Sequence, residues 1–410
     1  MTTFQENLEK YAELAVKVGV NIQPGQTLVI RTPISALELV RLVAKKAYEA
    51  GAKNVHVEWS DEELTRTKFH LAPDEAFHEY PAWIAKGFEE LAENGAAFLS
   101  ITGQDPDLLK DADPERVANL NKAGGKALKT FRSYIMADKV SWSIVAAPSE
   151  GWAKKIFPDE SKDRAVEKLW EAIFAATRTD QADPVAAWKN HLKTLDEKMN
   201  ELNKRRYHAL HYKAPGTDLT IELPDTHLWV SGGSTNKDGV DFVANIPTEE
   251  VFTAAKKTGV NGTVTNTKPL NYGGTLIDQF TLTFKDGKVV DFTAEQGYET
   301  LKRLLDTDEG ARYIGEVALV PHQSPISETD LIFYNTLFDE NASNHLAIGT
   351  AYAFNIEGGK EMSEEELEQA GINTSITHVD FMIGSSEMDI DGITKDGKRE
   401  PVFRKGNWAF

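Results

Sequence analysis

The stretch ITHVDFMI, residues 376–383, is an apolar run interrupted by His378 and Asp380. Read as a β-strand, it places these two side chains on the same face, because side chains repeat every two residues along a strand. An imidazole and a carboxylate side by side on an otherwise apolar strand need a partner. A metal ion would satisfy both, and the alternative is a His–Asp pair that is satisfied within the core.

The chain around this run, from about residue 209 onward, carries many short strand patterns. Strands are expected at 220–223, 227–230 and 262–264, with a hairpin at 281–292. The hairpin contains Asp286-Gly287, a pair typical of a tight turn with positive φ. Helices are expected near 297–307, 337–353 and 363–370. These patterns predict an α+β half with much antiparallel pairing.

The first half of the chain alternates between helix and strand patterns. Strands are expected at 27–30, 54–59, 96–101 and 140–145. Helical patterns cover 4–19, about 36–50, about 61–95 and about 114–130. Strands separated by helices of roughly 10 to 15 residues predict crossover units and a mainly parallel sheet, and therefore an α/β fold.

The length of 410 residues exceeds what one hydrophobic core usually serves, so two domains are expected. We place the N-terminal α/β domain at 1–190 and the C-terminal α+β domain at 191–410. Residues 163–206 read as helix with a break near Asp180 to Pro184. The charged stretch after that break either links the two domains or is a plain surface helix.

The charge and cysteine content limit the classes of function. The net charge is −19, which disfavours nucleic acid and anionic membranes as partners. The chain has no cysteine, so any metal ion must be held by histidine, carboxylate or other oxygen ligands. No signal peptide and no membrane span are visible, and a soluble cytoplasmic protein is the simplest interpretation.

His345 and Tyr352 lie seven residues apart in a stretch expected to be helical. Seven steps of about 100° return to the same face, which places the two side chains two turns, or about 10 Å, apart. That distance is long for two ligands of one ion. It suits a cluster of two ions, or a helix that breaks at Gly349. The alternative is a His and a Tyr with ordinary hydrogen bonds at a helix–sheet interface.

Glu316 is the one acid in an apolar, strand-like run, where it would share a face with Ile314 and Ala318. A buried carboxylate requires a metal ion or a basic partner. The alternative is an edge strand whose acid faces water.

Glu249 and Glu250 follow Thr248, which could cap a turn that one of the two acids stabilises while the other binds a metal ion. His322 lies six residues after Glu316 and could assist in the same site.

Four segments together resemble a known family. They are NIPTEEVFT at 245–253, GEVALV at 315–320, DENASNHLA at 339–347 and HVDFM at 378–382. In this order they resemble the aminopeptidase T / aminopeptidase S family of thermophilic metallo-aminopeptidases. The N-terminal half also looks like the family's α/β domain, so the resemblance covers essentially the whole chain.

The resemblance implies two divalent metal ions, either zinc, cobalt or magnesium. Matched motif by motif, it gives the ligands as Glu250, Glu316, His345, Tyr352, His378 and Asp380. The choice of Glu250 over Glu249 rests on the resemblance alone. The family likeness also implies a cytoplasmic homodimer whose substrates are peptides with a free N-terminus.

The expected activity is therefore metal-dependent removal of the N-terminal residue from peptides. Two ions need a bridging ligand, for which Glu316 is the candidate, and a bridging hydroxide would attack the scissile carbonyl. Tyr352 could bind as phenol or phenolate.

A proton carrier is also needed, and Glu340 and Glu249 are the candidates. Glu340 could equally be a first-turn acid of the helix expected to hold His345. Two other functions stay open at this point: a dinuclear phosphoesterase, and a metal-stabilised dimeric binding protein without activity.

Overall fold

The computed structural model describes residues 3–272 and 275–410. The chain forms two compact units. The first contains the chain up to Asn190 together with Gly233–Pro247, and the second contains His191–Gly232 and Thr248–Phe410. The division between Asn190 and His191 falls within a long helix, α9 (Pro184–Arg205).

The first unit is built on a parallel four-stranded sheet in the order β2-β1-β3-β4. Its strands are β1 (Thr27–Pro33), β2 (Asn54–Ser60), β3 (Ala97–Thr102) and β4 (Trp142–Ala146). The predicted α/β fold with a mainly parallel sheet is confirmed. The strands β1 and β3 are almost wholly buried, as expected when helices connect successive parallel strands.

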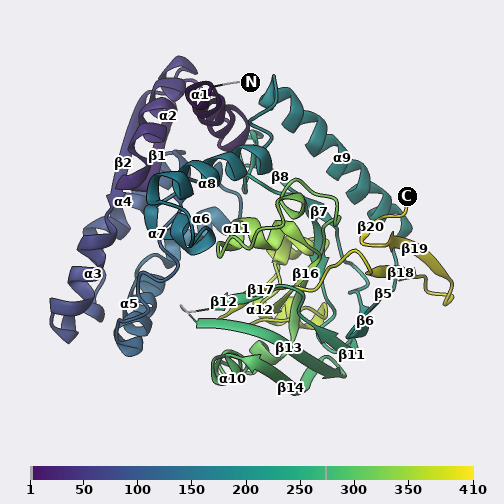
Figure 1. Ribbon diagram of the computed structural model, residues 1–410. Helices are drawn as coiled ribbons and strands as arrows, with labels where there is room; N and C mark the ends of the chain where they lie inside the picture. The colour runs from purple at the N-terminus through teal and green to yellow at the C-terminus, as the bar shows by residue number, and fades with distance from the viewer. Residues whose placement is uncertain (1–2, 273–274) are drawn as a thin grey trace. The chain divides into compact units, whose positions relative to one another are not determined.

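Eight α-helices accompany this sheet in the described part of the first unit. They are α1 (Phe4–Leu14), α2 (Leu37–Glu49), α3 (Glu62–Leu71), α4 (Ala82–Glu93), α5 (Pro114–Ala127), α6 (Lys129–Met136), α7 (Glu150–Ile156) and α8 (Lys162–Ala176). Side-chain caps begin several of them, including a capping box between Thr3 and Glu6 on α1. The helices α1 and α2 lie side by side, as Figure 1 shows.

The segment Gly233–Pro247 follows residue 190 in sequence, yet it packs in the first unit. It contains the short antiparallel pair β8 (Gly233–Thr235) and β9 (Asp241–Val243). The Ile144 N–H then donates to the Ala244 carbonyl, and the Ile246 N–H donates to the Ile144 carbonyl. These backbone hydrogen bonds join the segment to the edge of β4.

The second unit contains two antiparallel sheets, and the predicted α+β fold is confirmed. The five-stranded sheet has the order β17-β16-β15-β10-β7. Its strands are β7 (Val230–Ser231), β10 (Val251–Ala254), β15 (Ile314–Leu319), β16 (His345–Gly349) and β17 (His378–Met382).

The nine-stranded sheet has the order β12-β13-β11-β6-β5-β18-β19-β20, with β14 paired to β13. Its strands are β5 (Ala209–Ala214), β6 (Thr217–Glu222), β11 (Val260–Thr265), β12 (Leu270–Tyr272), β13 (Thr275–Lys285), β14 (Lys288–Gln296), β18 (Asp389–Ile393), β19 (Arg399–Arg404) and β20 (Asn407–Trp408). The predicted Asp286-Gly287 hairpin joins β13 to β14, and both turn residues have positive φ. The helix α10 (Tyr298–Leu305) lies against this hairpin (Figure 1), and two further helices are α11 (Thr336–Asp339) and α12 (Glu364–Gln369).

The five-stranded sheet has two chemically different faces. One face is apolar and joins the core that the two sheets share, with Val317, Leu346 and Phe381 opposite one another on β15, β16 and β17. On the other face, the register aligns Ala254, Glu316, Ala347 and Asp380 across four strands. A neighbouring row on that face contains Phe252, Ala318, His345 and Met382. Alternation along the strands therefore separates the core from a face that carries polar residues.

The helix predicted at 337–353 is wrong beyond Ala342. Helical structure ends at Ala342, and His345–Gly349 forms the strand β16 between β15 and β17. All five residues of β16 are buried, and hydrogen bonding to two neighbouring strands overrides the local helical pattern.

The interpretation of Glu316 as an exposed acid on an edge strand is also wrong. The strand β15 has β16 on one side and β10 on the other, so it is an interior strand of the sheet. All of its residues are buried, including Glu316.

None of the helices in the described part of the chain has the length and apolar character that crossing a bilayer requires.

Gly349 ends β16 with a φ of +107°, and a Cβ there would lie 2.1 Å from the Thr377 carbonyl oxygen. We expect Gly349→Ala to lower the free energy of unfolding by about 3 kcal/mol or more, from positive-φ strain plus the clash. Gly397→Ala is the control, because φ there is +82° and a Cβ meets nothing within 4 Å. It should cost about 1 kcal/mol. Urea denaturation of both variants tests this, and equal losses would contradict it.

Candidate metal centre

The six residues predicted as ligands all belong to the second unit. Glu250 immediately precedes β10, Glu316 lies on β15 and His345 on β16. His378 and Asp380 share one face of β17, as the alternation of ITHVDFMI predicts. Tyr352 follows the end of β16 instead of projecting from a helix. Four adjacent segments of one sheet therefore bring together residues that are up to 130 positions apart in sequence.

Glu316 lies at the centre of this group. Its Oε1 is 3.7 Å from His345 Nε2, and its Oε2 is 3.6 Å from His378 Nε2. On one side, Glu250 Oε2 lies 3.3 Å from His345 Nε2. On the other, Asp380 Oδ1 lies 3.5 Å from His378 Nε2.

The donor atoms form two groups, and within each group all ligand atoms lie within 4.8 Å of one another. The groups are Glu250, Glu316 and His345, and Glu316, His378 and Asp380. The carboxylate of Glu316 belongs to both.

Backbone carbonyls fix the orientation of both imidazoles. His345 Nδ1 donates to the Ser343 carbonyl at 3.1 Å, and His378 Nδ1 donates to the Thr350 carbonyl at 2.8 Å. A carbonyl only accepts hydrogen bonds, so Nδ1 carries the proton and Nε2 is directed at the carboxylates. This is the arrangement that metal-binding histidines commonly show.

Close backbone packing around Gly315 supports the hydrogen bond from His378 to the Thr350 carbonyl. A Cβ at position 315 would lie 2.4 Å from the carbonyl oxygens of both Gly349 and Thr350. Glycine therefore allows the Thr350 carbonyl to lie where it accepts from His378. Gly315 also interrupts the register between β15 and β16, just before Glu316.

The site concentrates negative charge where little of it is exposed to water. Glu250 is 8% exposed, Glu316 is 5% exposed and His345 is 1% exposed. Burial raises the pKa of Glu316, and the two histidines act against this rise. Burial lowers the pKa of His378, but Asp380 and Glu316 outweigh it and raise that pKa to about 10. Buried carboxylates in such a group need compensating positive charge.

The donors fit divalent metal ions. Each group combines two carboxylates with one imidazole, which are ligands that zinc and related ions accept. Asp380 Oδ1 is buried and accepts no hydrogen bond from the described residues. A buried oxygen that accepts no hydrogen bond and lies beside other donor atoms is suited to bind a cation.

Tyr352 lies at the edge of the donor groups. Its ring centroid is 4.9 Å from that of His378. Burial raises the pKa of Tyr352 well above its ordinary value, and nearby carboxylates, Glu316 first among them, raise it further. The turn at Gly349 brings Tyr352 toward the sheet face, so the 10 Å separation expected from a continuous helix does not apply.

Glu340 begins a short 3-10 helix, Glu340–Ala342, that ends before β16. The alternative that it is a first-turn acid of a helix carrying His345 is therefore wrong. Glu340 is half-buried. Burial raises its pKa well above the ordinary value, and the charges of Asp380 and Glu250 raise it further.

Glu249 and His322 lie outside the two donor groups. The Glu249 carboxylate is 3.5 Å from His191 Nε2 on α9, and the Glu249 N–H donates to Asn341 Oδ1. His322 is exposed, and its N–H donates to the Gly406 carbonyl.

Asn341 is a residue whose role the sequence did not reveal. It is fully buried, and its side chain makes three hydrogen bonds. Its Oδ1 accepts from the Glu249 N–H at 2.8 Å, while its Nδ2 donates to the Leu337 carbonyl at 3.1 Å and to Glu340 Oε1 at 3.3 Å. It therefore joins the segment before β10 to the segment before β16. The sequence shows that Asn341 belongs to the motif DENASNH. It does not show that the side chain bonds to Glu249, which lies 92 positions earlier in the chain.

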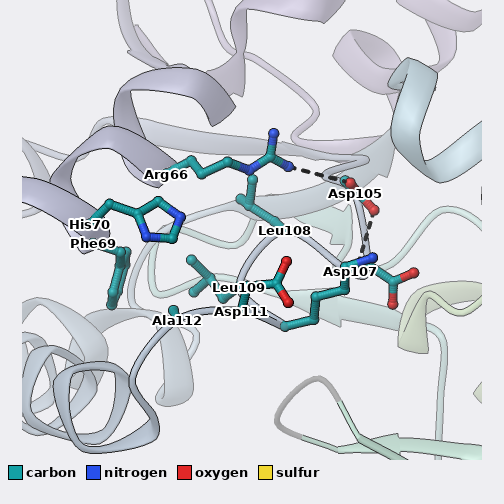
Figure 2. A pocket seen from close by; sticks show the side chains of 10 residues that line it. Arg66, Phe69, His70, Asp105, Asp107, Leu108, Leu109, Asp111 and Ala112 are labelled. Atoms are coloured by element: carbon teal, nitrogen blue, oxygen red, sulfur yellow. Dashed lines mark hydrogen bonds and ion pairs between the residues drawn. The ribbon is translucent and has the colours of Figure 1, made fainter.

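A separate cavity of about 340 Å³ lies in the first unit, between α3 and the loop at 105–112. Figure 2 shows Arg66 directed at Asp105 across its rim, with a separation of 3.7 Å between the charged atoms. Its lining contains none of the metal-donor residues.

Comparison with known proteins identifies the family of this chain. The family model described as "Thermophilic metalloprotease (M29)" matches residues 4–408. The chain belongs to the M29 family of thermophilic metalloproteases. Membership of M29 implies a metal cofactor, and the two donor groups supply residues that could hold one.

Curated relatives of this M29 chain match along its whole length. Aminopeptidase AmpS of Bacillus subtilis (strain 168) is 60% identical over 410 residues, which cover 100% of both chains. Aminopeptidase 2 of Geobacillus stearothermophilus is 62% identical, covering 100% of this chain and 99% of that relative. A solved structure, described as wild-type AmpT from Thermus thermophilus, is similar with a TM-score of 0.95 and 46% identity, covering 100% of both chains. The predicted resemblance to the aminopeptidase T / S family is confirmed.

We expect Asn341→Leu to lower the free energy of unfolding by about 2–4 kcal/mol, because it removes buried hydrogen-bond partners from the Glu249 N–H and the Leu337 carbonyl. The control is Asn261→Leu, in which an exposed amide loses one bond, to the Asp286 N–H. The control should change stability by less than about 1 kcal/mol. Chemical denaturation of both variants makes the comparison, and a harmless Asn341→Leu would show that these bonds contribute little.

Proposed function

We propose that this M29 protein is an aminopeptidase that removes N-terminal residues from peptides with the aid of two divalent ions. One observation carries the proposal: the Glu316 carboxylate belongs to two donor groups, each completed by one histidine and one further acid. The names of the relatives support aminopeptidase activity. The donor chemistry is compatible with zinc, cobalt or magnesium.

In this proposal Glu250, Glu316 and His345 hold one ion, and Glu316, His378 and Asp380 hold the other. Tyr352 adds a phenolic oxygen at the edge of the second group. When bound, such ions polarise the scissile carbonyl and lower the pKa of a bound water toward about 7. The three carboxylates carry three negative charges, and two divalent ions carry four positive charges. The ions would therefore compensate the charge of the buried carboxylates, with one positive charge left over.

Glu340 is the residue that we assign to proton transfer. Burial and the charges of Asp380 and Glu250 raise the pKa of Glu340 above its ordinary value, which makes its carboxylate a stronger base than a solvated glutamate. A hydrogen bond from Asn341 Nδ2 restrains one of its oxygens. As a carboxylate, Glu340 would take the proton that the attacking water loses. As the carboxylic acid so formed, it would pass that proton to the nitrogen of the leaving amine when the bond from that nitrogen to the carbonyl carbon breaks. Glu249, the other candidate, lies against His191 and is assigned a structural part.

A peptide with a free N-terminus suits such a centre, because its α-amine nitrogen and its first carbonyl oxygen are both ligands that divalent ions accept. The names of the relatives favour this substrate over a phosphate ester. A homodimer and a cytoplasmic location remain part of the proposal through the family resemblance.

The test of this function is hydrolysis of leucyl-peptides before and after chelation. We expect chelator-treated protein to lose at least about 90% of its activity and to regain it when zinc, cobalt or magnesium is added. The same peptides with an acetylated N-terminus should not be cleaved. Cleavage of the acetylated peptides would contradict an aminopeptidase, and full activity after verified metal removal would contradict a metal-dependent one.

Two isosteric variants separate metal binding from proton transfer. We expect Glu316→Gln to lose bound metal and to lower kcat/KM by about 100-fold or more, because both donor groups share that carboxylate. Glu340→Gln should keep its metal content yet lose about 100- to 10,000-fold in kcat. Metal analysis with parallel kinetics tests both. The control is Glu222→Gln, a half-buried acid that pairs with Lys256, and it should retain full activity. A fully active Glu340→Gln would exclude Glu340 as the proton carrier.

A further inference from the structure

Three aromatic rings form a cluster beside the candidate metal centre. Tyr352 and Phe354 are stacked, with centroids 5.0 Å apart and ring planes 10° apart. The ring of Phe252 stands edge-on to both, at 6.3 Å from Tyr352 and 6.1 Å from Phe354. We call these three residues the aromatic wall.

The wall keeps apolar surface that the fold does not bury. All three residues are only partly buried. None of them is a member of the core shared by the two sheets, or of the small cluster of Ala254, Ile356 and Ile372. Partly exposed aromatic surface next to convergent polar groups is typical of a ligand-binding pocket.

The wall directly adjoins the metal donors. Phe252 lies two residues after Glu250, and it shares its row of the sheet with Ala318 and His345. The intervening Ala318 is small, so no large side chain of this row separates the Phe252 position from that of His345. At the other end, the ring of Tyr352 is 4.9 Å from the ring of His378.

We infer that the aromatic wall binds the side chain of the substrate's N-terminal residue, and that the enzyme prefers aromatic and large aliphatic residues there. This inference rests on the proposed function. A peptide whose α-amine and first carbonyl lie at the donor groups carries its first side chain on the Cα atom that joins those two groups. The Tyr352 end of the wall lies 4.9 Å from the ring of His378. The wall is thus within reach of that side chain, which gains by leaving water.

A positive charge next to Phe354 of the aromatic wall favours a neutral substrate side chain over a basic one. The Lys360 ammonium lies 5.9 Å from the centroid of the Phe354 ring. One face of that ring therefore already attracts a cation. A lysine or arginine side chain of the substrate would meet the like charge of Lys360, whereas a phenylalanine or leucine side chain would not.

The experiment measures kcat/KM for phenylalanyl-, leucyl-, alanyl- and lysyl-p-nitroanilides with the metal-loaded enzyme. For the wild type we expect the phenylalanyl and leucyl substrates to exceed the alanyl and lysyl ones by about 10-fold or more. In Phe354→Ala and in Phe252→Ala, the ratio of phenylalanyl to alanyl kcat/KM should fall by about 5-fold or more. This ratio is insensitive to a uniform loss of active enzyme.

Phe292→Ala is the matched control, because Phe292 is also partly buried and stacked on a tyrosine ring, Tyr298, at 5.0 Å. Its ratio should stay within about 2-fold of the wild type. Phe354→Leu keeps apolar bulk and should retain most of the preference, so it serves if the alanine variant does not fold.

Unchanged ratios in the wall variants, or a wild-type preference for alanyl or lysyl substrates, would overturn the inference while leaving the aminopeptidase proposal intact. A metal-loaded wild type that cleaves none of the four substrates, nor the leucyl-peptides, would instead overturn the proposed function.

Discussion

The arrangement of the second unit depends on one constraint: an interior strand of its five-stranded sheet carries a buried carboxylate. Glu316 lies on β15, with a strand on either side, and only 5% of its surface is exposed. An ionised carboxylate in such a place costs several kcal/mol unless positive charge compensates it. The imidazoles of His345 and His378, on the two following strands of the sheet, are placed to share that compensation with bound cations.

The sheet keeps the charged side chains apart from the apolar core by placing them on opposite faces. Val317 and Leu346 point into the core, while Glu316 and His345 point to the opposite face. A shift of one residue in the pairing of β15 with β16 would bury the charged groups in the core and expose the apolar ones. The stability of the core and the geometry of the donor groups are therefore set by the same register. Ala318 and Ala347 lie between the donors on that face and leave room for them.

Backbone conformation outside the strands completes the centre. The turn at Gly349 and the close approach at Gly315 set the carbonyls that orient His378, and they return Tyr352 to the sheet face. Asn341 fixes the segment before β10 to the segment that carries Glu340. The donor residue Glu250, just before β10, and the proposed proton carrier Glu340 thus belong to different segments of the chain, which the buried amide of Asn341 joins.

The sequence by itself determined the local features. Alternation in ITHVDFMI placed His378 and Asp380 on one face, and regular spacing predicted the parallel sheet of the first unit, because both patterns depend on near neighbours in the chain. The sequence could not place His345 on a strand, since β16 exists through hydrogen bonds to β15 and β17, whose residues lie about 30 positions away in either direction. Nor could it show Glu316 to be buried, or Phe252 to lie beside Tyr352. Only tertiary pairing decided these positions, because distant strands must meet before their side chains share a face.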